Sequence, residues 1–209
     1  MKPNTMAMIA AGSILLTALP ADQTVTSSEL DHARLYLQQT QAGAVGATKG
    51  LSPEQWSFKP APDRWSIAEI VEHMVLVQDF VLGPVRQQLA KAPVPGSRDT
   101  ARVDAIVVNQ LPDRTAKFQA PEFVQPTGRW TPAGSMERLL KNYAQFTDFL
   151  EKTPDLRQHA VDSPPLKAVS KGSYTTMDGY QWILAAAAHV ERHTKQILEV
   201  KADANFPLK

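Results

Sequence analysis

Hydrophobic side chains recur at intervals of three or four residues in four separate stretches of this 209-residue chain, a spacing that predicts four amphipathic helices. The first stretch covers residues 28–49. The second starts after Ser66, which with Glu69 forms the capping-box pattern of a helix N-terminus. Its apolar positions continue to Gly83-Pro84, a pair that kinks or ends a helix because proline lacks a backbone N–H. The N-terminal half of the chain therefore contains two predicted helices.

The third and fourth helices are predicted in the C-terminal half. Ser135 is the predicted N-cap of the third helix, whose apolar stripe ends at Thr153-Pro154. The fourth helix is predicted to begin at Thr176 or Met177 and to run to Val200. Both helices carry a broad apolar stripe, so each is expected to pack against a common core.

Two long connections separate these helices. Residues 92–134 contain prolines at six positions, which excludes one long helix and favours an ordered crossover with a short helix or strand over residues 99–109. Residues 155–175 form the second connection. No internal repeat or series of strands competes with this pattern. The predicted fold is all-α, a four-helix bundle with long crossover connections.

The first 21 residues have the features of a secretory signal peptide: one basic residue, an apolar run from Met6 to Leu19, and small residues up to Ala21. The apolar run is shorter than the roughly 20 residues that cross a bilayer. We therefore predict cleavage after Ala21, a single mature domain over residues 22–209, no membrane span in the mature chain, and a periplasmic or secreted location.

Composition excludes several classes of function. The 22 Lys and Arg residues balance 21 Asp and Glu residues, so net charge gives no argument for a nucleic acid or an anionic membrane as partner. The chain has no cysteine, which excludes disulfides and thiolate metal ligands. Any metal must be held by imidazole, carboxylate or water, a set that suits zinc, nickel, copper or iron.

Two histidines on the predicted fourth helix are the strongest candidates for chemistry. His189 and His193 are four residues apart, which leaves about 40° between their side chains on a helix and places both on one face. The same face carries four apolar residues: Trp182, Ala186, Ile197 and Val200. Both imidazoles are therefore expected to face the core, where their nitrogens need partners.

A third imidazole, His73, lies on the apolar stripe of the second helix in line with Ile70 and Val77. Three histidines with a fourth position left open are typical of a catalytic metal site, because structural sites are usually closed by four protein ligands. The alternative is that all three are core histidines satisfied by carbonyl or hydroxyl groups.

The remaining candidates are weaker. His32 and His159 lie in polar surroundings and are predicted to be solvated. Glu72 and Glu191 neighbour the core histidines in sequence but point about 100° away, which leaves a supporting role open and favours exposure. Gln196 could reach the histidines or could be an ordinary residue at the edge of the helix face.

Four segments together resemble the DinB/YfiT-like superfamily. They are residues 51–60 (LSPEQWSFKP), 65–73 (WSIAEIVEH), 179–182 (GYQW) and 189–197 (HVERHTKQI). The resemblance covers nearly all of the chain after the signal segment. It implies a four-helix bundle, often a homodimer, that holds zinc or nickel through His73, His189 and His193.

The resemblance also implies a metal-dependent enzyme that activates a water or a substrate thiol for transfer or hydrolysis of an unknown small molecule. Thiol S-transferases and a mycothiol-dependent isomerase are among the relatives it suggests. The apparent signal peptide departs from that pattern, because the thiols those relatives use are cytosolic. A non-catalytic metal-binding or ligand-binding bundle is the alternative function.

Overall fold

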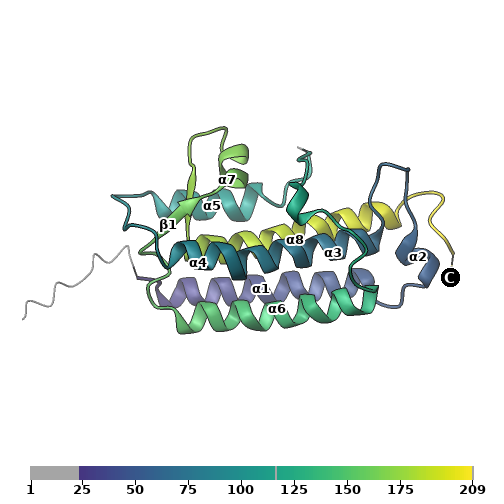
Figure 1. The fold of residues 1–209 in the computed structure, drawn as a ribbon, viewed down its shortest axis with the longest axis horizontal. Coiled ribbons are helices and arrows are strands. Elements are labelled where there is room, and N and C mark those ends of the chain that lie inside the picture. The colour runs from purple at the N-terminus through teal and green to yellow at the C-terminus, as the bar shows by residue number, and fades with distance from the viewer. Residues whose placement is uncertain (1–23, 116, 209) are drawn as a thin grey trace, which may run out of the picture.

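Four long helices lie side by side along the longest dimension of the molecule (Figure 1) in the computed structural model, which describes residues 24–115 and 117–208. They are α1 (Ser27–Thr48), α3 (Ile67–Phe80), α6 (Pro132–Lys152) and α8 (Gly179–Lys201). The main contacts between them follow the cyclic order α1, α8, α3, α6. The predicted four-helix bundle is confirmed, whereas the predicted signal peptide at residues 1–21 lies outside the described residues.

Helices α1 and α8 are parallel neighbours. Tyr180 in the first turn of α8 donates a hydrogen bond to the Glu29 carbonyl in the first turn of α1. At the other end, Lys201 donates to the Ala47 carbonyl. The chain can reach parallel neighbours only by crossing the whole length of the bundle between them, so long crossovers are a necessity of this fold.

Helix α6 runs opposite to α1. Arg34 and Glu151 form an ion pair at one end of these two helices, and Thr48 contacts Met136 at the other. The connection after α3 carries the chain back along the bundle, so that α3 and α6 run in the same direction (Figure 1). Consequently α3 and α8, which carry the three candidate histidines, are antiparallel neighbours.

Side-chain caps define where the bundle helices begin. Thr26, Ser66 and Asp178 each accept from a backbone N–H three residues later, and the residue at that position returns a bond to the cap, which completes three capping boxes. The predicted cap at Ser135 is wrong: Thr131 caps α6, and Pro132 fills its first position. Proline is favoured there because its missing N–H would lack a helical partner anyway.

The second predicted helix bends at its glycine and proline rather than stopping. Residues Val81–Val85 form a π-helical turn, η2, and the chain continues as the short helix α4 (Arg86–Leu89). Pro84 lies inside this turn. A wider turn accommodates a residue that cannot donate in the regular helical ladder, so the sequence signal there indicates a local bulge.

Short elements fill the connections. They are α2 (Pro53–Ser57), α5 (Thr100–Gln110), η3 (Glu122–Val124), β1 (Ala160–Asp162), α7 (Pro164–Val169) and β2 (Thr176–Asp178). The segment predicted as a short helix or strand is the helix α5. The predicted start of the fourth helix at Thr176 or Met177 is wrong, because these residues pair with β1 in a two-stranded antiparallel ribbon. The helix begins only after Asp178.

The core lies between the four long helices. Its largest fully buried side chains come from α3, α6, α7, β2 and α8: Ile67, Ile70, Met74, Leu139, Phe146, Leu150, Leu166, Met177, Tyr180, Ile183, Leu184 and Ile197. Burial of this apolar surface is the main force that holds the bundle together. No helix within residues 24–115 and 117–208 is long and apolar enough to cross a membrane.

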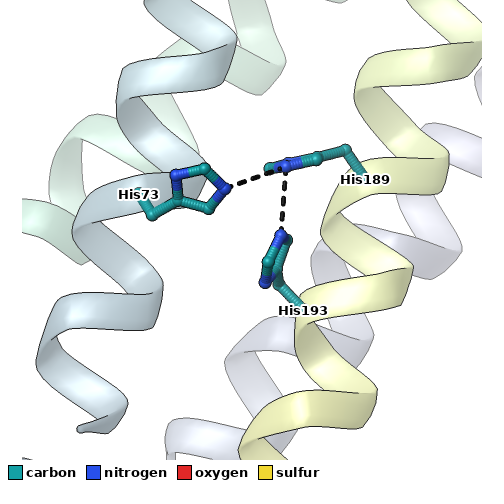
Figure 2. A group of neighbouring side chains, drawn as sticks. All are labelled: His73, His189 and His193. Atoms are coloured by element: carbon teal, nitrogen blue, oxygen red, sulfur yellow. Dashed lines mark hydrogen bonds between the residues drawn. The ribbon is translucent and has the colours of Figure 1, made fainter. Parts of the chain in front are cut away.

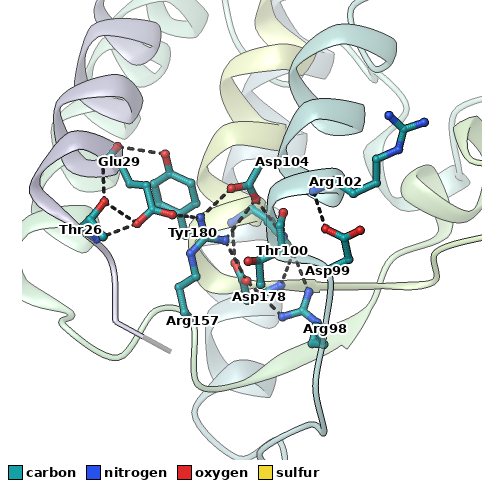
Figure 3. Close-up of polar contacts among 11 residues, drawn as sticks. Thr26, Glu29, Arg98, Asp99, Thr100, Arg102, Asp104, Arg157, Asp178 and Tyr180 are labelled. Atoms are coloured by element: carbon teal, nitrogen blue, oxygen red, sulfur yellow. Dashed lines mark hydrogen bonds and ion pairs between the residues drawn. The ribbon is translucent and has the colours of Figure 1, made fainter. Parts of the chain in front are cut away.

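A cluster of charged side chains, from fully buried to partly exposed, joins the first turn of α1 and the N-cap of α8 to α5 (Figure 3). At its centre is Arg157, whose side chain is 2% exposed. Its guanidinium donates to Asp104 at 2.6 and 3.1 Å, to Asp178 at 3.2 Å, and to Glu29. Arg98 donates to Asp178 at 3.1 Å. Each of the three carboxylates therefore faces a guanidinium inside the protein. We call these five residues the ion cluster.

Candidate metal centre

The three core-facing histidines meet between α3 and α8 (Figure 2). The Nε2 atom of His189 lies 3.2 Å from Nε2 of His73 and 3.1 Å from Nε2 of His193. One nitrogen from each ring belongs to a group whose members all lie within 4.8 Å of one another. The structure thus brings together the three residues that the sequence predicts, and we refer to them as the imidazole triad.

Hydrogen bonds at Nδ1 of His73 and His193 determine that the lone pair of each ring is on Nε2. Nδ1 of His73 donates to the Val124 carbonyl at 2.7 Å, and Nδ1 of His193 donates to Oε1 of Gln196 at 2.8 Å. Arg114 also donates to that amide oxygen, at 3.2 Å, which identifies it as the acceptor. Because a neutral imidazole carries one N–H, both Nε2 atoms present lone pairs toward the centre of the triad.

His189 stands between these two acceptors and cannot satisfy both. A neutral ring has one hydrogen to donate, and two Nε2 lone pairs face it. Its buried Nδ1 has no hydrogen-bond partner among the described residues. A divalent cation removes this conflict by accepting all three lone pairs. A tetrahedral zinc site with Zn–N distances of about 2.0–2.1 Å holds its nitrogens about 3.3 Å apart, close to the two separations that involve His189. The donor set and its geometry therefore fit a metal ion.

Burial keeps the triad in the neutral form that metals bind. It lowers the pKa of His73, against the opposing hydrogen bond to Val124. Burial also lowers the pKa of His189 and of His193 well below the usual range, and the neighbouring imidazoles lower both further. Metal ligation requires a deprotonated nitrogen, so at neutral pH protons do not compete for these lone pairs.

Access to the triad is uneven. His73 and His193 are 4% and 7% exposed, whereas His189 is only partly buried. The Trp65 ring lies 4.8 Å from the ring of His73, which encloses that ring further. His189 is therefore the least enclosed of the three residues.

Glu72 and Glu191, the two carboxylates close to the triad in sequence, differ in burial and in hydrogen-bond partners. Glu72, predicted to favour exposure, is 3% exposed and accepts hydrogen bonds from the backbone amides of residues 127–129. Glu191 accepts from the Tyr36 hydroxyl at 2.7 Å and pairs with Lys195 on the outside of α8. Helical phase could not reveal the buried partners of Glu72, because they come from a distant loop.

The remaining histidines lie outside the triad. His32 is exposed, as predicted. The prediction of a solvated His159 is wrong, because its ring is half-buried and Nδ1 pairs with the Ala92 carbonyl. Gln196, for which two roles were open, contacts His193. Sequence reasoning missed Val124 and Arg114, whose loop positions carry no periodic signal.

Comparison with known proteins agrees with the fold and the triad. The sequence profile of the DinB superfamily matches residues 36–197, a range that includes all three histidines. The chain belongs to the DinB superfamily. A relative in this comparison is the uncharacterized protein YuaE of Bacillus subtilis (strain 168). It is 23% identical over 154 residues, which cover 73% of this chain and 87% of YuaE.

A solved structure with the same fold is YfiT from Bacillus subtilis. It is described as a probable metal-dependent hydrolase with an unusual four-helix bundle topology. The match has a TM-score of 0.57 and covers 92% of this chain and 97% of YfiT, at 13% sequence identity. At that identity the match establishes the shared fold.

Proposed function

We propose that this DinB superfamily protein is a divalent-metal-dependent hydrolase whose metal ligands are His73, His189 and His193. The observation that carries the proposal is the convergence of three Nε2 atoms, two of them fixed as acceptors by bonds at the opposite nitrogens. Three ligands leave a coordination position free, as in catalytic rather than structural sites. Zinc or nickel is the proposed ion, since both suit imidazole ligands.

The chain's own residues prepare the centre. Val124 and Gln196 hold two rings in the ligating tautomer, and burial keeps all three neutral. When bound, a divalent ion supplies positive charge that favours the anionic form of a nearby water or substrate group. We propose that a substrate approaches on the side of His189, the least enclosed residue of the triad.

Hydrolysis is preferred to thiol transfer for two reasons. The description of YfiT as a probable metal-dependent hydrolase supports that reaction class for a chain of the same fold. The predicted signal peptide supports it independently, because a periplasmic or secreted protein works where water is abundant and cytosolic thiols are not.

Metal analysis tests the proposal. The protein, purified without added metal, is expected to contain close to one equivalent of a divalent ion, and His193→Ala is expected to lose it. His32→Ala is the matched control, because His32 is an exposed histidine outside the triad. A parent protein without a stoichiometric ion, loaded neither from the cell nor by added zinc or nickel, contradicts the proposal.

A second function is a metal-binding protein without turnover. The observation that favours it is that both carboxylates adjoining the triad are committed elsewhere, Glu72 to a loop and Glu191 to Tyr36. Neither is then available as a base. A screen of ester, amide and phosphoester substrates with the fully loaded protein separates the two functions, since hydrolysis that His193→Ala abolishes excludes the second.

A further inference from the structure

The connection between α5 and α6 is held against the bundle by one buried carboxylate. Glu72 accepts from the backbone amides of Thr127, Gly128 and Arg129 at 3.0, 2.9 and 3.2 Å, and from the Thr127 hydroxyl at 3.3 Å. Within residues 24–115 and 117–208, these three amides have no backbone acceptor. Gly128 has a φ of +73°, a conformation that glycine adopts without strain and that helps to turn the amides toward one carboxylate.

The same loop supplies the acceptor for His73. Val124 ends the short helix η3 (Glu122–Val124), three residues before Thr127, and its carbonyl receives the His73 Nδ1–H. Glu72 and His73 are consecutive residues of α3, so one turn of this helix contacts the loop at two points, residues 127–129 and Val124. The first point binds the loop, and the second orients an imidazole of the triad.

The start of the loop is fixed near the other end of the triad. Arg114 donates to both carboxylate oxygens of Glu199 at 2.6 and 2.8 Å, and to the Gln196 oxygen that accepts from His193. One connection therefore supplies the environment of the outer nitrogens on both His73 and His193. It holds the His73 tautomer directly through Val124, and it supports the His193 tautomer through Arg114, which donates to Gln196.

We propose that Glu72 is a positioning residue for the triad: it clamps residues 127–129 so that the Val124 carbonyl holds His73 with Nδ1 protonated and Nε2 directed inward. Without the clamp, the loop amides lose their only acceptor and the carbonyl is no longer held at the ring. Glu72 acts through the loop, without contact to the triad nitrogens or to a substrate. The part of the proposal that concerns metal affinity rests on the proposed function.

Glu72→Gln is the test, with Glu191→Gln as matched control. The glutamine amide has nearly the shape of the carboxylate, but an NH₂ group replaces one accepting oxygen. This NH₂ group is a donor and cannot accept a hydrogen bond from the backbone amides of the loop. Glu191 lies two residues from both His189 and His193 but contacts Tyr36 and Lys195 rather than the loop. Both variants lose one negative charge, so a difference between them reports the clamp.

Two readouts use the metal-free protein at a pH where the imidazoles are neutral. Nitrogen NMR is expected to show His73 protonated at Nδ1 in the parent and in Glu191→Gln, and a mixture of tautomers in Glu72→Gln. Amide hydrogen exchange at residues 127–129 is expected to be protected in the parent and at least 10-fold faster in Glu72→Gln. An unchanged tautomer in a folded Glu72→Gln protein overturns the proposal.

The third readout is zinc affinity measured by competition with a chelator. Loss of an outer-sphere partner typically lowers metal affinity 10–100-fold, so Glu72→Gln is expected to weaken zinc binding by that factor while Glu191→Gln changes it less than about twofold. If the parent binds no divalent metal, the proposed function fails, and the tautomer and exchange measurements still decide the role of Glu72.

The parent protein alone provides a test if Glu72→Gln does not fold. In the part of the chain that the structure describes, the amides of Gly128 and Arg129 have no acceptor other than Glu72, so their protection is expected to depend on this contact. Exchange at the rates of an unstructured peptide in the folded parent contradicts the clamp. Protection comparable to that of the ends of α3 supports it.

Discussion

The ion cluster lies at the N-terminal end of α8 and the imidazole triad near its middle, yet the two groups of polar side chains are satisfied in opposite ways. In the ion cluster, the guanidiniums of Arg157 and Arg98 face the carboxylates of Asp104, Asp178 and Glu29 (Figure 3). In the triad, the three Nε2 atoms face one another (Figure 2). The Nε2 atoms of His73 and His193 are both acceptors, and His189 has one N–H to donate.

The difference shows which polar groups are fully paired within the protein and which would gain a partner from a ligand. At the first turn of α8, charges from distant segments neutralise one another, so the cluster needs nothing from outside. Near the middle of α8, the Nδ1 atoms of His73 and His193 have hydrogen-bond acceptors in the protein. Their Nε2 atoms instead face Nε2 of His189. Buried polar groups normally have partners, so the incomplete set supports the proposed metal site.

The largest expected effect comes from removing the centre of the ion cluster. Arg157→Met leaves Asp104 and Asp178 buried with less compensation, and loss of one partner from a buried ion pair costs about 3–5 kcal/mol. Urea denaturation measures this change in unfolding free energy. Arg34→Met, which removes a partly exposed ion pair on the surface, is the control and is expected to cost about 0–1 kcal/mol.

The triad is expected to respond in the opposite way. His189→Leu removes a ring that its neighbours cannot satisfy, so the stability of the metal-free protein should change by less than about 1 kcal/mol. Zinc at 100 times its dissociation constant should stabilise the parent by about 2.7 kcal/mol and the variant hardly at all. A large loss of stability in metal-free His189→Leu would show that the triad is a structural network like the ion cluster.

A smaller effect is expected at the partner of His193. Gln196→Leu removes the acceptor for Nδ1 and should weaken zinc binding about 10–100-fold. Gln196→Glu keeps an accepting oxygen at that position and should retain most of the affinity. Competition with a chelator measures both variants. Equal losses would mean that the amide at this position matters for packing rather than for the tautomer.

The smallest expected effect is an acid-induced loss of stability in the ion cluster. Burial raises the pKa of Glu29, but hydrogen bonds from Thr26 and Arg157 outweigh it, and the net pKa lies below the ordinary value of 4.5. Stability from Glu29 is therefore complete above about pH 4.5 and is lost as pH falls through the folded-state pKa. Denaturation curves of the parent and Glu29→Gln should converge as the pH is lowered through this range.

Periodicity along the chain was enough to predict the bundle and the triad. His73, His189 and His193 lie on apolar helix faces, and a face of a long helix can be read from residue spacing alone. The capping box at Ser66 also located the start of α3 correctly. These features depend on residues that are near one another in sequence.

The surroundings of the triad could not be predicted in the same way. The amides that bury Glu72 lie 55–57 residues further along the chain, in a loop without a periodic pattern. The start of α6 was misplaced because Ser135 and Thr131 both have capping side chains, and only Pro132 after Thr131 distinguishes them. Long-range partners and competing caps are settled by packing.

The sequence separation of the triad has a mechanical consequence. His73 and His189 are 116 residues apart, on helices joined through the long connection. An ion held by both would act as a reversible crosslink that closes a loop of this length and reduces the freedom of the unfolded chain. After a single cut within residues 90–98, the two fragments would then associate through the shared core, more tightly with the ion bound and less tightly once a chelator removes it.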